Sequence, residues 1–171
     1  INVGKRSGSH SFTQQQINEL LIQKAFQHKV IVRLKGGDPC IFGRAAEEAR
    51  ALADASVEFE IVPGVTSAIA AAEYAGIMLT DRDSSSQVLF ATGRESEGKE
   101  SSGIDWEILA RFCGSIVFYM GVGSLDGIVQ RLLERGAPQI MPVCIIENAT
   151  LPHQRVLRGV LEFAAPGGRE A

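Results

Sequence analysis

The chain has 171 residues, of which 45% are hydrophobic and 22% are charged, a balance typical of globular proteins and unlike that of disordered ones. This length suits one ordinary domain or two small ones and permits a core of useful size. The net charge of −3 gives no general attraction to nucleic acid or to an anionic membrane, although it is compatible with a local basic patch for an acidic small molecule.

Helical and strand patterns alternate through the first half of the chain. Thr13 and Gln16 have the spacing of a capping box, and the apolar residues that follow predict a helix with one buried face. Short β-branched runs predict parallel strands that are covered on both sides. In chain order we expect a helix after Thr13, a strand at 30–34 (VIVRL), a helix at 43–55, a strand at 58–62 (EFEIV) and a helix at 66–76 closed by Gly76.

A polar stretch at 80–86, TDRDSSS, indicates a hinge before a second series of strands. Beyond it we expect strands at 87–92 and 115–120, a helix carrying Leu125 to Leu133, and strands at 142–146 and 155–163. The alternation predicts the α/β class with largely parallel sheets. The predicted domains are an N-terminal lobe at 1–80, a hinge at 81–86 and a C-terminal lobe at 87–171.

Four short loops rich in small residues follow predicted strands. They are GGDP (36–39), PGVTSA (63–68), YMGVG (119–123) and ENAT (147–150). Open α/β sheets bind ligands beyond the carboxyl ends of their strands, and small residues let a flat ligand approach the backbone. One such loop alone would favour mere turn chemistry, whereas four at four strand ends indicate a binding cleft.

Other site classes lack their signatures. The sequence contains no G-x-x-x-x-G-K-[ST] and no G-x-G-x-x-G opening a helix after a strand, which argues against triphosphate or dinucleotide binding. No G-x-S-x-G accompanies His10, His28 or His153, so we expect no hydrolase triad. No cluster of His, Asp and Glu has metal spacing, so we expect no metal site.

The cysteines and the apolar segments indicate in which cellular compartment the protein is expected and whether it spans a membrane. Cys40, Cys113 and Cys144 are far apart and form no C-x-x-C pair, which favours reduced thiols in a cytoplasmic protein. The most apolar window, 61–79, is interrupted by proline, glycine and glutamate, so we expect no membrane span. The chain opens as if in mid-strand and without methionine, so we expect a fragment of a longer protein.

Four basic residues are candidates for binding an acidic ligand. Lys5 and Arg6 lie in a loop after the opening strand pattern, Arg44 stands just beyond GGDPCIFG, and Arg82 lies in the predicted hinge. Guanidinium groups match carboxylates bidentately, so their convergence would suit a polycarboxylate ligand. Taken singly, each is more simply explained as a solvated surface charge. Glu47 and Glu48 could pair with nearby arginines along a helix.

Five segments resemble successive blocks of the uroporphyrinogen-III C-methyltransferases, in the tetrapyrrole (cobalamin/siroheme) methylase superfamily. They are VGKRSGSHSFTQQQIN, VRLKGGDPCIFGR, VPGVTSAIAAAEYAGIMLTDRD, FYMGVGSL and PVCIIENATLPHQRVLRGVL. The blocks run in the family's order from residue 3 to about residue 163. GGDP, TSA and YMG are shared by the wider superfamily, whereas the block around GKR is more particular to the uroporphyrinogen enzymes.

The resemblance implies two α/β lobes with S-adenosylmethionine in the cleft between them, and a homodimer. It also implies two methyl transfers, to C2 and C7 of uroporphyrinogen III, which give precorrin-2 on the way to siroheme and cobalamin and leave S-adenosylhomocysteine. Lys5 would match the family's proton donor, and Arg44 and Arg82 would face the substrate's carboxylates. The implied cofactor contacts are Gly36, Gly37, Asp38, Ile41, Thr66, Ser67, Met120 and Ala149.

The sequence also departs from the family pattern. The family's opening strand and its G-x-G-P-G-D loop are absent, as are its last strands, which bears on cofactor affinity and turnover. Asp81 stands where the family usually has histidine, Cys40 replaces a large apolar residue, and Ala149 replaces glycine. Two alternatives therefore stand beside the leading hypothesis: a methylase of a later precorrin, and a non-catalytic dimerising or tetrapyrrole-binding fragment.

Overall fold

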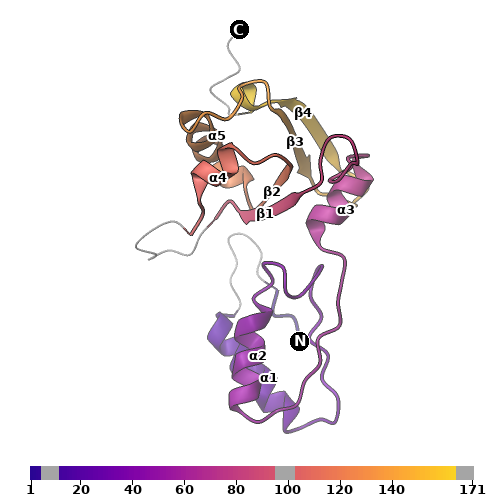
Figure 1. Ribbon diagram of the computed structural model, residues 1–171. Helices are drawn as coiled ribbons and strands as arrows, with labels where there is room; N and C mark the ends of the chain where they lie inside the picture. Colours follow the sequence, from indigo (N-terminus) through magenta and orange to yellow (C-terminus); the bar gives the residue numbers. More distant parts are fainter. Residues whose placement is uncertain (5–11, 95–102, 165–171) are drawn as a thin grey trace. The chain divides into compact units, whose positions relative to one another are not determined.

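The computed structural model describes residues 1–4, 12–94 and 103–164 (Figure 1). The chain divides into two compact units, Ile1–Thr66 and Ser67–Ala171, and each is described by itself. The helices and strands are α1 (Gln14–Ala25), α2 (Ala45–Asp54), α3 (Ser67–Tyr74), β1 (Val88–Thr92), α4 (Trp106–Ala110), β2 (Ser115–Tyr119), α5 (Leu125–Glu134), β3 (Pro142–Glu147) and β4 (Arg155–Val160). Two single 3-10 turns, η1 (Val122–Ser124) and η2 (Leu161–Phe163), complete the described elements.

The first unit is built on two helices, α1 and α2, which pack side by side (Figure 1). The predicted capping box at the start of α1 is confirmed. The Thr13 hydroxyl accepts the backbone N–H of Gln16 at 3.2 Å, and the Gln16 side chain accepts that of Thr13 at 2.8 Å. Ile17 on α1 and Ala45 on α2 are buried, which places the small core of this unit on the facing sides of the two helices.

The two strands that the sequence predicts in this unit, 30–34 and 58–62, do not form. Neither segment takes part in a β ladder, and Val30, Leu34 and Val62 are 79%, 82% and 71% exposed. A strand requires a neighbouring backbone to satisfy its N–H and C=O groups, and a two-sided apolar run requires cover on both faces. Both segments are apolar as their sequences indicate, but they have no pairing strand in the described part of the first unit.

The second unit contains two separate pairs of strands. β1 and β2 are parallel and in register from Val88↔Ser115 to Thr92↔Tyr119. Helices α4 and α5 pack together, and a buried hydrophobic cluster gathers around Trp106, Leu109 and Leu132. The predicted strands and the predicted helix α5 are confirmed to within a few residues.

The other pair, β3 and β4, is antiparallel from Pro142↔Val160 to Glu147↔Arg155. Only residues 148–154 connect the two strands, and a parallel crossover needs about a dozen residues or more. The expectation of parallel strands therefore holds for β1 and β2 but not for this pair. The α/β class itself is confirmed, because helices and strands alternate from β1 to β3 and β1 pairs with β2 in parallel.

Helix α3 groups with the second unit rather than the first. The side chains of Gln154 and Arg158 bind backbone carbonyls at its C-terminal end, which ties α3 to β4 and the loop before it. The units thus divide after Thr66, whereas the predicted lobes divide at 81–86. The hinge role of 81–86 stays a prediction. None of the helices in the described ranges is long and apolar enough to cross a membrane.

Candidate functional site

Asp38 holds the GGDP loop against the PGVT segment. Its Oδ1 accepts the backbone N–H of Cys40 at 2.8 Å, and its Oδ2 accepts that of Gly64 at 3.2 Å. These donors, Gly64 first and then Cys40, with a weaker one at Ile41, stabilise the ionised carboxylate and lower the pKa of Asp38. Two of the four predicted loops are therefore joined directly by one of the predicted cofactor residues.

The approach of these two loops depends on glycine. A Cβ at Gly64 would stand 2.7 Å from the carbonyl oxygen of Gly37, a separation that Cβ atoms do not adopt. Gly37 has a φ of 104°, which side chains strongly disfavour. At Gly36, by contrast, a Cβ would meet no atom within 4 Å. The backbone at Gly36 is thus open to a flat ligand, which fits the predicted role in cofactor binding.

The loops after β1 and β2 also meet through glycines. The N–H of Gly93 donates to the carbonyl of Tyr119 at 2.7 Å, and a Cβ on Gly93 would overlap the Cα of Gly121. Met120, a predicted cofactor residue, has a φ of 55° and is mostly exposed. Such left-handed conformations in residues other than glycine cluster at ligand sites, so the strain at Met120 supports a role for this loop.

The ENAT loop after β3 shows the same kind of backbone. Asn148 and Thr150 have φ values of 49° and 69°, and Ala149 lies between them, half-buried. Gly93 belongs with these loops although it is not among the predicted site residues. Its signal was a glycine directly after a predicted strand, the same signal that selected the others.

Thr66 and Ser67 are neighbours in the chain but differ in surroundings. Thr66 is buried and is the last residue of the first unit, whereas Ser67 is exposed and begins α3. Ile41 is half-buried beside the GGDP loop. Gly36, Gly37, Asp38, Ile41 and Thr66 therefore belong to one unit, and Ser67, Met120 and Ala149 belong to the other.

Arg44, predicted to face substrate, is already paired within the chain. It precedes α2 with a φ of 59°, and its guanidinium donates to both carboxylate oxygens of Glu47, at 2.7 and 2.6 Å. The hydrogen bond to Glu47 raises the pKa of Arg44. The arginine side chain is 48% exposed, so the fork is accessible to an external carboxylate. The expected helical pairing of Arg44 with Glu47 is confirmed.

Glu48 does not pair along the helix; it is buried among donors from other segments. Lys35 Nζ lies 3.0 Å from its Oε2, and Arg33 Nη2 and Gln14 Nε2 lie 3.2 and 3.1 Å from its Oε1. Burial opposes ionisation, but the bonds from Lys35 and Gln14 and the two positive charges prevail and lower the pKa of Glu48. Glu48 thereby ties α2 to the residues immediately before GGDP. This role was not predictable from local sequence, because the partners of Glu48 are 13 to 34 residues away in the chain.

Arg82 is exposed on a tight turn. Asp81 Oδ1 accepts the backbone N–H groups of Asp83 and Ser84, each at 3.0 Å, and the Ser84 hydroxyl at 2.9 Å. These bonds, the Ser84 hydroxyl first, lower the pKa of Asp81. The aspartate that replaces the family's usual histidine therefore shapes the turn that carries Arg82. Lys5, the predicted proton donor, lies outside the described residues.

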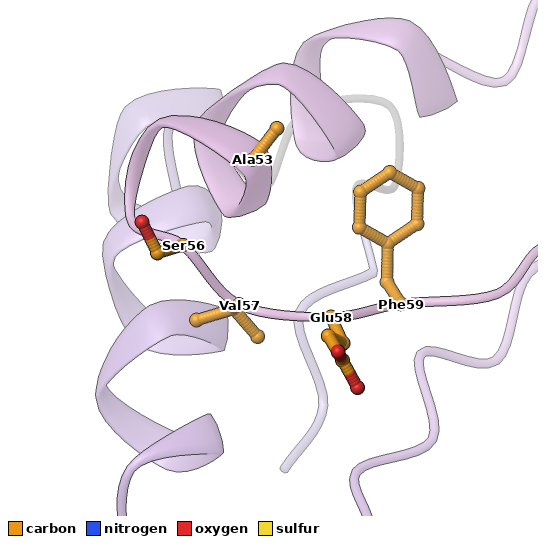
Figure 2. A pocket seen from close by; sticks show the side chains of 5 residues that line it. All are labelled: Ala53, Ser56, Val57, Glu58 and Phe59. Atoms are coloured by element: carbon orange, nitrogen blue, oxygen red, sulfur yellow. The ribbon is translucent and has the colours of Figure 1, made fainter.

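The hollows of the first unit do not coincide with the predicted site residues. One, of about 540 Å³, is open and is lined by Ala53, Ser56, Val57, Glu58 and Phe59, where the chain leaves α2 (Figure 2). A second, of about 440 Å³, lies against the apolar face of α1. Among the described residues, no group of three or more His, Cys, Asp or Glu side chains could hold a metal ion. The candidate site residues thus lie on backbone loops that do not line either of these two hollows.

Known proteins resemble the chain over most of its length. Residues 2–165 match the tetrapyrrole (corrin/porphyrin) methylases. The chain is 53% identical over 161 residues to an S-adenosyl-L-methionine-dependent uroporphyrinogen III methyltransferase of Methanosarcina barkeri, covering 94% of this chain and 63% of that protein. It is 49% identical to a siroheme synthase of Zymomonas mobilis, covering 95% of this chain and 34% of the synthase.

A solved structure agrees with these relatives. The uroporphyrin-III C-methyltransferase of Thermus thermophilus, complexed with S-adenosylhomocysteine, has a TM-score of 0.78 and 36% identity, covering 92% of this chain and 68% of that one. The chain spans less than two thirds of the length of the curated relatives described above. With residues 2–165 matching the family and the fold shared at this level, the chain belongs to the tetrapyrrole (corrin/porphyrin) methylases.

Proposed function

We propose that the chain is the methylating part of an S-adenosylmethionine-dependent enzyme that converts uroporphyrinogen III, by C-methylation at C2 and C7, to precorrin-2. The observation that carries the proposal is the pair of glycine loops held together by Asp38, with open backbone at Gly36, in a chain of this family. The names of the Methanosarcina and Thermus relatives support the substrate and the cofactor. The siroheme synthase relative supports a place in siroheme formation.

The proposed cofactor contacts are made by Gly36, Gly37, Asp38, Ile41, Thr66, Ser67, Met120 and Ala149. Asp38 acts through the loops, because both of its carboxylate oxygens already accept backbone N–H groups and hold Gly64 and Cys40 in place. Bound S-adenosylmethionine would supply a methyl group on its sulfonium, to which an electron-rich pyrrole carbon could bond in line as the sulfur–methyl bond breaks and S-adenosylhomocysteine leaves. Alignment by the loops supplies much of such catalysis, so the chemistry demands neither a metal nor a strong base.

The proposed substrate contacts are Arg44 and Arg82. A substrate carboxylate would replace Glu47 on the Arg44 fork, exchanging one bidentate partner for another. Lys5 is proposed as the proton donor. We also propose a homodimer in the cytoplasm; the thiols of Cys40, Cys113 and Cys144 are free, which is compatible with that compartment.

Calorimetric titration with S-adenosylhomocysteine, followed by transfer of labelled methyl groups from S-adenosylmethionine to uroporphyrinogen III, tests the proposal. We expect binding and a product carrying two added methyl groups. Arg44→Ala should raise KM for the tetrapyrrole about tenfold, the equivalent of one charge-assisted hydrogen bond, with little change in cofactor affinity. Arg50→Ala, at an exposed position on α2, the helix that Arg44 precedes, is the matched control. Turnover of a later precorrin without turnover of uroporphyrinogen III would overturn the substrate assignment. If Arg44→Ala weakened binding of the tetrapyrrole and of the cofactor equally, the proposed role of Arg44 would be overturned.

A further inference from the structure

Gln154 connects two segments that carry proposed cofactor residues. Its Oε1 accepts the backbone N–H of Thr150 at 2.8 Å, next to Ala149. Its Nε2 donates to the backbone carbonyl of Tyr74 at 3.3 Å, at the end of the helix that begins with Ser67. One half-buried amide therefore uses both of its ends on backbone groups that are far apart in the chain.

The C-terminus of α3 shows why this contact matters. A helix leaves its last four carbonyls without intrahelical partners. The carbonyls of Ala72 and Glu73 accept the N–H groups of Ile77 and Gly76, at 2.8 and 3.0 Å, and Gly76 has a φ of 66°. This pattern is a Schellman motif, and it satisfies two of the four carbonyls locally.

The remaining two carbonyls accept hydrogen bonds from side chains of β4 and of the loop before it. The Tyr74 carbonyl accepts from Gln154, and the Ala75 carbonyl accepts from Arg158 Nη2 at 2.7 Å. Arg158 lies on β4, and Gln154 lies in the loop directly before that strand. The helix end is therefore fastened at two points, but only the Gln154 bond also reaches the ENAT loop.

From these contacts we infer that Gln154 is a positioning residue that holds α3 and the ENAT loop as one piece. The inference rests on the proposed function, because it concerns how Ser67 and Ala149 are presented to S-adenosylmethionine. Helix α3 is only about 12 Å long at 1.5 Å per residue, so fixing its last carbonyls also fixes the place of Ser67 at its start. Binding to segments that are already ordered costs less conformational entropy, which raises affinity.

The test uses three variants of the full-length protein. Gln154→Met keeps the side-chain length and removes both bonds, whereas Arg158→Met removes only the tie to α3. Gln130→Met is the matched control, because Gln130 bonds only to Glu134 within α5, at 2.8 Å. Hydrogen exchange at Thr150 reports the bridge, and calorimetry reports affinity for S-adenosylhomocysteine under conditions in which each variant is fully folded.

We expect Gln154→Met to accelerate exchange at Thr150 and in α3, and to weaken S-adenosylhomocysteine binding about tenfold, with KM for S-adenosylmethionine raised and KM for the tetrapyrrole unchanged. Arg158→Met should accelerate exchange in α3 alone and weaken binding less, and Gln130→Met should change neither. A Gln154→Met protein that loses Thr150 protection but binds the ligand as tightly as the wild type would overturn the inference while the proposed function stands. A wild type without affinity would overturn the proposed function itself. If Gln154→Met does not fold, Gln154→Glu replaces it, because a glutamate keeps the acceptor for Thr150 and loses the donor to Tyr74. Unchanged affinity for S-adenosylhomocysteine in both Gln154→Glu and Arg158→Met would overturn the positioning role of Gln154.

Discussion

Replacing Glu48 by glutamine should destabilise the first unit and leave the second unchanged. Glu48 is the shared acceptor of Lys35, Arg33 and Gln14, and its side chain is only 7% exposed. A glutamine carbonyl can still accept from Gln14, but its amide presents N–H groups to the Lys35 ammonium. The variant therefore leaves Lys35, whose own side chain is 13% exposed, without its carboxylate.

The magnitude follows from the partners. Removing one member of a buried pair costs about 3–5 kcal/mol, and a charge-assisted hydrogen bond contributes about 1.5–3 kcal/mol. Arg33 is 29% exposed and can turn to water, so the loss falls mainly on the Lys35 bond. We expect the free energy of unfolding of the first unit to fall by about 2–3 kcal/mol. Glu47→Gln, at the exposed pair with Arg44, should cost under about 1 kcal/mol.

The assay must distinguish the two units. The single tryptophan, Trp106, and both tyrosines, Tyr74 and Tyr119, belong to the second unit, so intrinsic fluorescence does not report on the first. Hydrogen exchange in urea, measured on peptides from α1 and α2, reports on the first unit directly. Equal protection of these helices in Glu48→Gln and Glu47→Gln, or a shift confined to Trp106 fluorescence, would refute the reasoning.

The pH dependence gives a second check on Glu48. Its pKa is lowered below the usual 4.5 in the folded state, so the carboxylate contributes stability that is fully present above that value. This contribution is lost as the pH falls through the lower folded pKa. The difference in unfolding free energy between wild type and Glu48→Gln should therefore be constant at neutral pH and shrink in acid. A difference that instead grew below pH 4.5 would contradict the assignment.

Three further predictions concern the loops. Gly64→Ala should weaken S-adenosylhomocysteine binding, measured by calorimetry, because its Cβ would meet a backbone carbonyl at 2.7 Å. Gly36→Ala should leave the fold intact, because its Cβ would have no neighbour within 4 Å. Equal free energies of unfolding for the two variants would contradict this difference. The pKa of the Asp38 carboxyl should lie below its usual 3.8 in an NMR titration. The hydrogen bonds from Asp38 to the loops should therefore persist as the pH falls through 3.8 and be lost only at lower pH. A normal or raised pKa would refute these hydrogen bonds. Gly93→Ala should lower the free energy of unfolding by about 1–3 kcal/mol, seen as a lower urea midpoint in Trp106 fluorescence. Gly123→Ala is its control, because a Cβ there meets no atom within 4 Å. Equal urea midpoints for the two variants would show that the strand-end loops tolerate the Cβ.

Local signals in the sequence were the reliable ones. The capping box of Thr13 and Gln16 and the apolar face of α5 predicted real helices, because caps and helical periodicity depend on residues within one or two turns. Helix α4 was missed, since five residues show no periodicity; Asp105, which accepts the N–H groups of Glu107 and Ile108, was the available signal. The runs at 30–34 and 58–62 looked like strands, but a ladder depends on a partner that local pattern does not supply.

The site was predictable as a list of loops but not as a geometry. Glycine and small residues after predicted strands selected GGDP, YMGVG and ENAT, and the resemblance to the methylases implied a ligand for them. The contact from Asp38 to Gly64 spans 26 residues, and the contact from Gln154 to Tyr74 spans 80. Nothing in the composition of either segment indicates its partner. The left-handed φ of Met120 and Thr150 was also not predictable, because methionine and threonine do not favour that backbone conformation.

The fastening of α3 also has a consequence for the order of folding. The ties that assemble the first unit around Glu48 join residues no more than 34 apart, whereas the two ties at the end of α3 join residues 80 and 83 apart. During synthesis, the carbonyls of Tyr74 and Ala75 lack these side-chain partners until Gln154 and then Arg158 have left the ribosome. Closing long loops is entropically costly and slow, so this helix docks late, after the compact helical pair has had time to form. The C-terminal end of α3 therefore stays without these two ties until late in synthesis.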